Sequence, residues 1–224
     1  MSKTNSDIVR EYLEEVFNRK HFENAFDYCN QDCVLHNSAY VGVGFVPDDS
    51  SGEKVIVKEI IPNSPATGKL RVNDEIVQVR DAGNDWKTFK ELKSGTWGQG
   101  ILDSELTIIV KRDGQVLDIP LIRGRIEAYD LKLTSVIDSW KHYTLTYVPE
   151  SNIEIKVIFE NEDLVAYYAV DTATNLEYHH SAVWDECGIY RLKNGKIIEM
   201  WGAENSFSQM KQFGYQILEP PQKP

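Results

Sequence analysis

Three side chains of this 224-residue sequence could carry proton transfer: His36, His180 and Glu204. Imidazole and carboxyl groups exchange protons near neutral pH when their surroundings shift the pKa, and they are common general acids and bases. With Asp185 or Glu186, the two histidines could form a proton relay or a metal site. The alternative is that these histidines are hydrogen-bonded or solvent-exposed and take no part in chemistry.

A metal site built from the adjacent pair His179 and His180 is excluded by strand geometry. Neighbouring residues on a strand point to opposite faces, so the two rings cannot share one ion. We predict no metal and no cofactor.

A glycine-containing segment, Gly42-Val43-Gly44-Phe45, suggests a second kind of site. Glycine permits a turn in which successive backbone N–H groups point at one carboxylate. A peptide C-terminus bound there could continue as an added strand. The alternative is a glycine-rich entry to a strand. A dinucleotide loop is excluded, because the third glycine is missing and Pro47 stands where a helix should begin.

The remaining pattern predicts elements that would position these residues. Apolar residues at helical spacing predict helices at 8–17, 22–28 and 126–143, the first capped by Ser6 or Asp7. Alternation with period two then predicts strands at 153–159, 164–170, 178–192 and 197–201, with a tight turn at 193–196. With a strand at 33–36 and a helical turn at 207–213, this is an α+β fold.

The predicted sheet must curl around the long helix to bury its apolar face, and this leaves a cavity at the open end. We predict that a small apolar molecule binds there, against Trp140, Trp184, Met200 and Asn205.

The composition limits the partners and the compartment. A net charge of −11 and a pI near 4.9 disfavour nucleic acid and membrane surfaces as partners. No segment is long and apolar enough to span a bilayer. Cys29 and Cys33 have a poor spacing for a metal or a disulfide, so we expect buried free thiols and a cytoplasmic protein.

Two families share features with this chain. The element order resembles the nuclear transport factor 2 fold, and Ile189 to Trp201 resembles the closing hairpin of SnoaL-like polyketide cyclases; Gln212-Phe213-Gly214 is similar to their terminal Gln-Leu-Gly. Within residues 40–124, the segments 40–45, 63–66 and 71–79 resemble a PDZ domain of the circularly permuted type found in bacterial tail-specific and HtrA-type proteases. No catalytic set of a protease accompanies it.

The resemblance implies a discontinuous cone domain, 1–39 and 125–224, interrupted by a PDZ domain at 40–124. It also implies a homodimer formed through the exposed face of the cone sheet. SnoaL-like cyclases use an acid directly after the Glu-His-Trp element or three residues later. Here these positions are Gly202 and Asn205, and the partner histidine falls at Gly188, so the consensus machinery is missing.

Two hypotheses follow from these patterns. The first is a binding protein whose cone holds a small apolar ligand, while Gly42, Val43, Gly44 and Phe45 bind the C-terminal carboxylate of a protein partner. The alternative is a cyclase- or isomerase-type enzyme with a non-consensus acid/base pair, gated by the PDZ domain. A buried polar pair with shifted pKa values in the cone would favour the enzyme, and a dry apolar cavity would favour binding.

Overall fold

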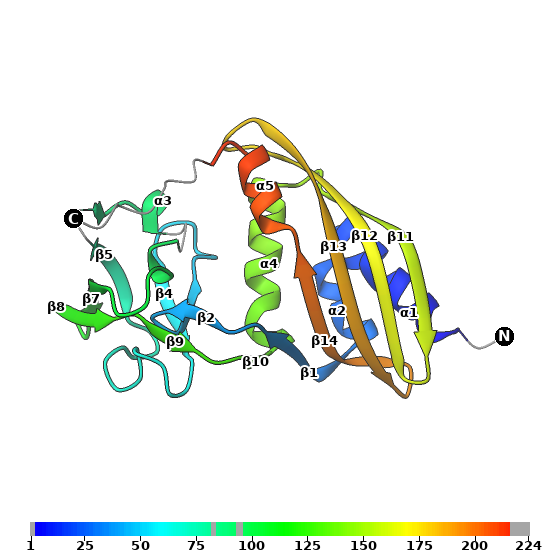
Figure 1. Cartoon of the computed structure of the whole chain (residues 1–224), viewed down its shortest axis with the longest axis horizontal. Coiled ribbons are helices and arrows are strands. Elements are labelled where there is room, and N and C mark those ends of the chain that lie inside the picture. Colours follow the sequence, from blue (N-terminus) through cyan, green and yellow to red (C-terminus); the bar gives the residue numbers. More distant parts are fainter. Residues whose placement is uncertain (1–2, 82–83, 93–95, 216–224) are drawn as a thin grey trace. The chain divides into compact units, whose positions relative to one another are not determined.

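The computed structural model describes residues 3–81, 84–92 and 96–215, and the chain divides into two compact units. Unit 1 is Met1–His36 with Asp130–Pro224, and unit 2 is Asn37–Tyr129 (Figure 1). None of the helices in the described residues is long and apolar enough to cross a membrane.

The N-terminal helices of unit 1 form where the sequence predicts them, with a different cap. Thr4 accepts a hydrogen bond from the Asp7 amide at 3.1 Å, and Asp7 accepts from the Thr4 amide at 3.0 Å. This capping box starts the helix two residues before the predicted cap. The helical elements are α1 (Asn5–Tyr12), the π-helical η1 (Leu13–Asn18), the 3-10 turn η2 (Phe22–Asn24) and α2 (Ala25–Tyr28).

The long helix of unit 1 begins later than predicted. It is α4 (Leu133–Tyr147), whereas Ile126 lies in β9 (Gly124–Ile126) and Tyr129 begins β10 (Tyr129–Lys132). Ile126 pairs with Tyr40 across a short ladder. Spacing of three residues in a short window fits a broken strand as well as a helix, so tertiary pairing decided the outcome.

Unit 1 is built on a six-stranded sheet with the strand order β10-β1-β14-β13-β12-β11. The strands that follow α4 form an antiparallel meander, and β1 pairs with β14 in parallel. Asn194 and Gly195 both have positive φ, as the tight turn between β13 and β14 requires. The remaining elements are β1 (Cys29–Asn37), β11 (Asn152–Asn161), β12 (Leu164–Asn175), β13 (His180–Lys193), β14 (Lys196–Glu204) and α5 (Ser206–Gln212).

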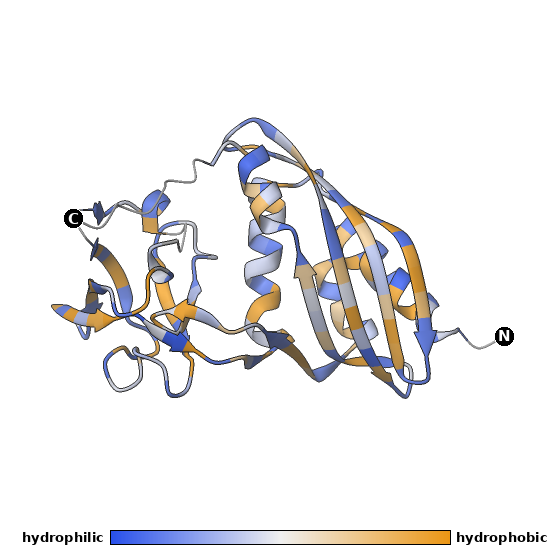
Figure 2. Cartoon of the chain, viewed as in Figure 1, coloured by the Kyte–Doolittle hydropathy of each residue, from blue (hydrophilic) through white to orange (hydrophobic). Residues whose placement is uncertain are grey.

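The two faces of this sheet differ in burial. Along β12 the buried residues alternate, and Val165, Tyr167, Ala169 and Asp171 define what we call the inner face. Helix α1 packs against β11 and β12. The opposite, outer face carries exposed apolar side chains, and Figure 2 shows long hydrophobic stretches on the edge strand β11.

The cysteines of unit 1 are free. Cys29 and Cys33 are buried on β1, as expected, whereas Cys187 is exposed on β13. A hydrogen bond to Cys33, followed by burial, raises the pKa of the Cys29 thiol above its ordinary value, which keeps it protonated and unreactive.

Unit 2 has a second sheet with its own apolar core. Its strand order is β3-β4-β5-β7-β8, with β6 added to β5, and β2 pairs with β9 beside it. Trp86 belongs to a short strand that pairs with Val79, and a single helical turn follows it. The elements are β2 (Tyr40–Gly42), β3 (Phe45–Asp48), β4 (Val55–Ile60), β5 (Glu75–Asp81), β6 (Asn84–Trp86), α3 (Phe89–Leu92), η3 (Thr96–Gly98), β7 (Glu105–Arg112) and β8 (Gln115–Ile122).

Candidate active site

Three acidic side chains come together on the inner face of unit 1, one from each of β12, β13 and β14. Glu186 stands opposite Glu204 on one neighbouring strand and Ala169 on the other, and Asp171 stands opposite Trp184. Residues directly opposite one another in an antiparallel pair share a face, with Cα atoms about 4.5–5.5 Å apart. The register therefore places the carboxyl groups of Asp171, Glu186 and Glu204 in one row.

Asp171 is the buried member of this row. It is 5% exposed, and burial raises its pKa to about 9, followed by the negative charge and a hydrogen bond of Glu186 and the charge of Glu204. Among the described residues, no lysine, arginine or histidine forms a salt bridge with any of the three, and the Asp171 Oδ1 atom has no hydrogen-bond partner. Asp171 is thus a neutral acid at pH 7.

Two tyrosines hold the second carboxyl group. The Tyr167 hydroxyl donates a hydrogen bond to the Glu186 carboxylate, and the Tyr190 hydroxyl lies 3.3 Å from that of Tyr167. Burial raises the pKa of both phenols, so both stay protonated. Glu186 thus has a hydrogen-bond donor in Tyr167, whereas the Oδ1 atom of Asp171 has none among the described residues.

Two glycines shape the space beside the acids. A Cβ added at Gly188 would lie 2.3 Å from the Tyr167 ring, so that ring lies over the bare backbone of Gly188. Gly202 stands opposite Gly188, and a Cβ added there would meet no atom within 4 Å. The inner face is therefore filled at Gly188 and open at Gly202, next to the acids.

This arrangement can both give and take a proton. The neutral Asp171 carboxyl group can give a proton, and Glu186, held by Tyr167, supplies a second carboxyl group in the same row that can take one. Paired carboxyl groups of this kind suit general acid/base catalysis.

His36 lies on the outer face, away from this row. Its Nδ1 atom lies 2.7 Å from Asp130, its Nε2 atom 3.5 Å from Glu199, and its ring stacks on Trp201 at a centroid distance of 4.3 Å. Trp201 stands opposite Ile189, which is exposed on the outer face. The sequence-predicted relay from His36 to the inner face is therefore not formed.

His180 is also separate from the acids. It is exposed at the start of β13, six residues before Glu186, which is about 20 Å along a strand. His179 has a φ of 55° and belongs to the preceding turn, so the strand-alternation argument for the two rings does not apply. Of the three residues predicted to be catalytic, only Glu204 reaches the acidic row.

The residues predicted to line the pocket are spread over the unit. Trp184 and Met200 lie on the inner face, opposite Asp171 and Tyr190 respectively. The Trp140 ring contacts Phe17 in the helical layer at 5.8 Å. The side chain of Asn205 caps α5 instead, accepting from the Ser208 amide at 3.2 Å.

The glycine loop of unit 2 has its amides bonded within the protein. The Val43 amide donates to the Gly98 carbonyl oxygen at 3.0 Å, and Gly42 bridges to Gln99. The Trp97 ring is buried and stacks on Phe45 at 5.8 Å. An internal segment, Trp97 to Gln99, thus lies along the predicted carboxylate loop.

A tyrosine takes up the next amide of the same loop. The Tyr40 ring packs on Gly42, where an added Cβ would lie 2.5 Å from it. Burial, then the neighbouring Tyr129 phenol, raises the pKa of Tyr40 to about 12, and a hydrogen bond from the Gly44 backbone opposes the shift. Gly44 itself has a φ of +83°, the left-handed region that favours glycine.

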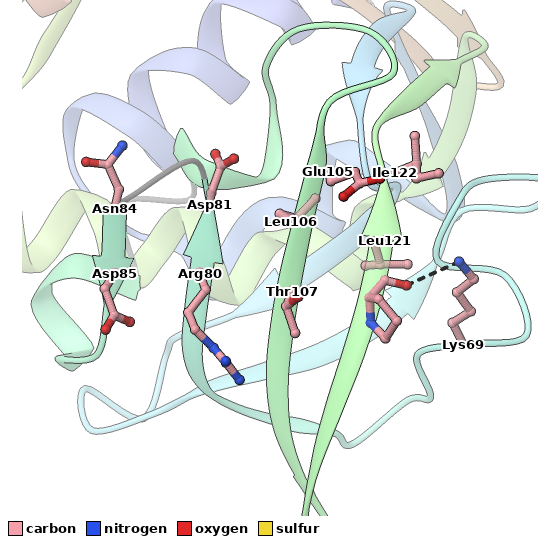
Figure 3. A pocket seen from close by; sticks show the side chains of 11 residues that line it. Lys69, Arg80, Asp81, Asn84, Asp85, Glu105, Leu106, Thr107, Leu121 and Ile122 are labelled. Atoms are coloured by element: carbon pink, nitrogen blue, oxygen red, sulfur yellow. Dashed lines mark hydrogen bonds between the residues drawn. The ribbon is translucent and has the colours of Figure 1, made fainter.

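Unit 2 also carries an open pocket of about 690 Å³ on its main sheet, shown in Figure 3. Two of its charged residues form ion pairs within the unit: Arg80 with Asp118, and Asp81 with Arg123. We assign no chemistry to it. It is lined by Lys69, Arg80, Asp81, Asn84, Asp85, Glu105, Leu106, Thr107, Pro120, Leu121 and Ile122.

Sequence reasoning missed Asp171 and Tyr167. The signal was present in β12, where Asp171 interrupts the apolar residues at positions of one parity, Val165, Tyr167, Ala169 and Ala173. A single acid on the buried face of a predicted strand is costly without a function or a partner.

Comparisons with known proteins identify the fold of this chain. No known protein-family profile and no curated protein matches the sequence. Among solved structures, IdmH, a proposed polyketide cyclase from Streptomyces antibioticus, is 13% identical with a TM-score of 0.50, over 95% of this chain and 100% of IdmH. A proposed polyketide cyclase from Acidithiobacillus ferrooxidans is 11% identical, with a TM-score of 0.47 over 96% and 98% of the two chains. An NTF2-like protein of unknown function from Burkholderia pseudomallei is 11% identical, with a TM-score of 0.43 over 95% and 100%.

At 13% identity the likeness to IdmH shows the fold alone. It confirms a mixed α+β, sheet-dominated fold that is consistent with the predicted cone. Nothing in these comparisons bears on a PDZ domain in unit 2, which stays a prediction.

Proposed function

We propose that unit 1 binds a small carbonyl compound and moves a proton on it, with Asp171 and Glu186 as the acid/base pair. The observation that carries the proposal is the buried Asp171 carboxyl group, whose pKa is raised to about 9 and whose Oδ1 atom has no partner among the described residues. A buried polar pair of this kind favours the enzymatic alternative over a purely apolar pocket. The fold, shared with a proposed polyketide cyclase, is compatible with it.

The two acids would have different roles. The neutral Asp171 carboxyl group donates its proton to the carbonyl oxygen of the ligand, and the Glu186 carboxylate takes a proton from the adjacent carbon. The product is an enol, so both protons are accounted for. Return of a proton at a different carbon gives an isomer. Attack of the enol carbon on a second carbonyl closes a ring, in which case the enol hydroxyl returns its proton to Asp171 and the new alkoxide takes the proton held by Glu186. Tyr167 orients Glu186.

Deuterium exchange tests this proposal without knowledge of the substrate. 2-Tetralone, a cyclic ketone with acidic benzylic α-hydrogens, is incubated with the protein in D2O, and loss of the α-proton signals is followed by NMR. We expect the wild type to accelerate exchange. Removal of a positioned acid or base typically costs about 10²- to 10⁴-fold, so Asp171→Asn and Glu186→Gln should each lose most of the acceleration.

Asp185→Asn is the matched control, because Asp185 lies beside Glu186 on β13 but points to the other face, where it accepts from the Tyr168 hydroxyl at 2.6 Å. This variant should exchange at the wild-type rate. If the wild type and Asp171→Asn exchange equally fast, the assigned pair is wrong.

For unit 2 we propose a PDZ-like module, residues 40–124, that recognises a protein C-terminus once its glycine loop is released. The left-handed Gly44 and the position of β3 at the edge of the sheet support strand addition there. The loop amides must give up their hydrogen bonds to Tyr40 and Gly98 before they can donate to the carboxylate of a peptide. A peptide therefore has to compete with the protein's own groups.

We also propose that unit 1 forms a homodimer through the outer face of its sheet. Phe159 is 62% exposed and Ile189 46% exposed. Both lie in one row of directly opposed residues that runs across the strands and ends at Trp201. An exposed apolar row with polar residues around it is typical of an interface. Light scattering should find a dimer for the wild type and a monomer for Phe159→Glu with Ile189→Glu; a monomeric wild type would refute the proposal.

A further inference from the structure

Three tyrosines lie together in unit 1, close to the exposed end of the acidic row. Tyr143 comes from α4, Tyr178 from the turn between β12 and β13, and Tyr215 follows α5. They are 45%, 37% and 40% exposed, so parts of all three rings are accessible to a ligand.

The rings are arranged at angles rather than stacked flat. The Tyr178 and Tyr215 rings have a centroid distance of 5.2 Å and an interplanar angle of 65°. Tyr143 lies within electrostatic range of Tyr178 and Tyr215. Three phenol rings at the surface, with two of them edge to face, present electron-rich faces to a ligand.

The charges around these rings are negative. Burial, followed by the negative charge of Glu204, raises the pKa of Tyr143, and Glu204 stands opposite Glu186 in register. Neither Glu204, Glu186 nor Asp171 forms a salt bridge within the described residues, and the Asp171 Oδ1 atom is buried without a partner. The row therefore has no cationic partner among the described residues, and a positively charged ligand group would complement Glu204.

We propose that this site selects ligands carrying a small organic ammonium group, which binds among Tyr143, Tyr178 and Tyr215 beside Glu204. Aromatic faces and a nearby carboxylate together recognise such cations, while neutral groups of the same shape gain only the apolar contact. The inference rests on the proposed function in one respect: the rest of the ligand extends towards the Asp171–Glu186 pair. Glu204 and Glu186 are cross-strand neighbours, whose Cα atoms lie about 5 Å apart. The ammonium group and the reacting carbon of the ligand would therefore be separated by only a few bonds.

The test compares choline with 3,3-dimethylbutan-1-ol, which has the same shape but no charge. Isothermal titration calorimetry on the full chain should give a Kd for choline at least about tenfold lower than for the alcohol. Glu204→Gln and Tyr143→Ala should each remove most of this preference. Both positions are exposed, so the variants are expected to fold.

The control is Tyr168→Ala, which removes a comparably exposed tyrosine, bonded to an acid, from the outer face. It should leave the preference unchanged. Equal affinity for the two probes, or no binding of either, would overturn the inference, as would a preference that survives both Glu204→Gln and Tyr143→Ala.

Failure of this inference and failure of the proposed function are distinguishable. Asp171→Asn should abolish deuterium exchange on 2-tetralone while the preference for choline is kept. Exchange without a choline preference would retain the acid/base pair and reject the ammonium site, and a choline preference without exchange would do the reverse.

Discussion

The acidic row of unit 1 and the glycine loop of unit 2 differ in how their polar groups are satisfied. In the row, the Asp171 Oδ1 atom and the Trp184 indole N–H have no hydrogen-bond partner among the described residues. In the loop, the Val43 and Gly44 amides bond to Gly98 and Tyr40 of the same unit. Buried polar groups are nearly always paired, so the unpaired ones point to where a ligand belongs.

The comparison also separates recognising a motif from recognising a working site. The glycine loop has a strong sequence pattern, yet its backbone amides already donate hydrogen bonds within unit 2. The acidic row has no sequence motif, yet its carboxyl groups are available to exchange protons with a ligand. The following predictions test whether this difference is real.

The largest expected effect is on stability as a function of pH. Native Asp171 keeps its proton up to about pH 9, whereas in the unfolded chain a carboxyl group loses it near the ordinary value of 3.8. Between these values the native state binds more protons, so the free energy of unfolding should fall as pH rises, by up to about 1.4 kcal/mol per pH unit. Asp171→Asn should remove this slope. Urea unfolding at about pH 5 and about pH 8 measures it, with Asp185→Asn as the control; parallel wild-type and Asp171→Asn curves would mean that Asp171 is not the titrating group.

The next effect concerns Gly44. A Cβ added there would lie 2.1 Å from that of Ser64, and its φ of +83° is unfavourable for any branched residue. Gly44→Val should destabilise unit 2 by at least about 3 kcal/mol. Hydrogen exchange should report loss of protection in unit 2 while unit 1 is unchanged.

Gly52→Val provides the matched control for Gly44→Val, because Gly52 has a φ of +72° but nothing within 4 Å of an added Cβ. It should cost only the backbone strain, about 1 kcal/mol. Equal losses in the two variants would show that close packing at Gly44 is unimportant.

Tyr40→Phe should open the loop. It removes the hydroxyl group that accepts from the Gly44 amide and leaves the ring in place, so a carboxylate-terminated peptide should bind up to about tenfold more tightly. Fluorescence anisotropy with a dye-labelled peptide ending in valine, and with its C-terminal amide, measures this. Tyr129→Phe, at the neighbouring ring, should change nothing. If the amide binds as well as the free acid, the loop does not recognise a carboxylate.

The smallest effect compares two buried tryptophans. The Trp97 indole donates to the Leu92 carbonyl oxygen at 2.9 Å, whereas that of Trp184 has no partner among the described residues. Trp97→Phe should therefore cost about 1 kcal/mol more than Trp184→Phe in chemical unfolding, since both lose similar apolar area. Equal costs would indicate that the Trp184 N–H is bonded after all, for example to water.

The sequence was informative where a local rule fixes the outcome. Period-two alternation predicted the strands of the meander, and Asn194-Gly195 predicted their tight turn. Sequence-based prediction failed where residues on other strands determine the surroundings of a side chain. Gly188 was interpreted as a lost histidine, but its missing side chain makes room for Tyr167, which holds Glu186. No pattern along β13 alone could show that an adjacent strand supplies the polar group.

The acid itself could have been found on β12, but its environment could not. The raised pKa of Asp171 depends on burial and on Glu186 and Glu204, which reach it only through the register of three strands. The predicted relay from His36 failed for the same reason, because one position of strand register decides which face a side chain occupies.

The pairing of β1 with β14 has a consequence for synthesis of the chain on the ribosome. These strands come from opposite ends of the sequence, so the sheet of unit 1 cannot be completed until nearly all of the chain has emerged. The ends of unit 2, by contrast, meet at Tyr40 and Ile126, and its sheet is complete by then. Unit 2 can therefore fold first, while the early helices and β1 wait for their partner with apolar surface exposed. We expect the stretch from Asn5 to Asn37 to be the part of the nascent chain that chaperones protect.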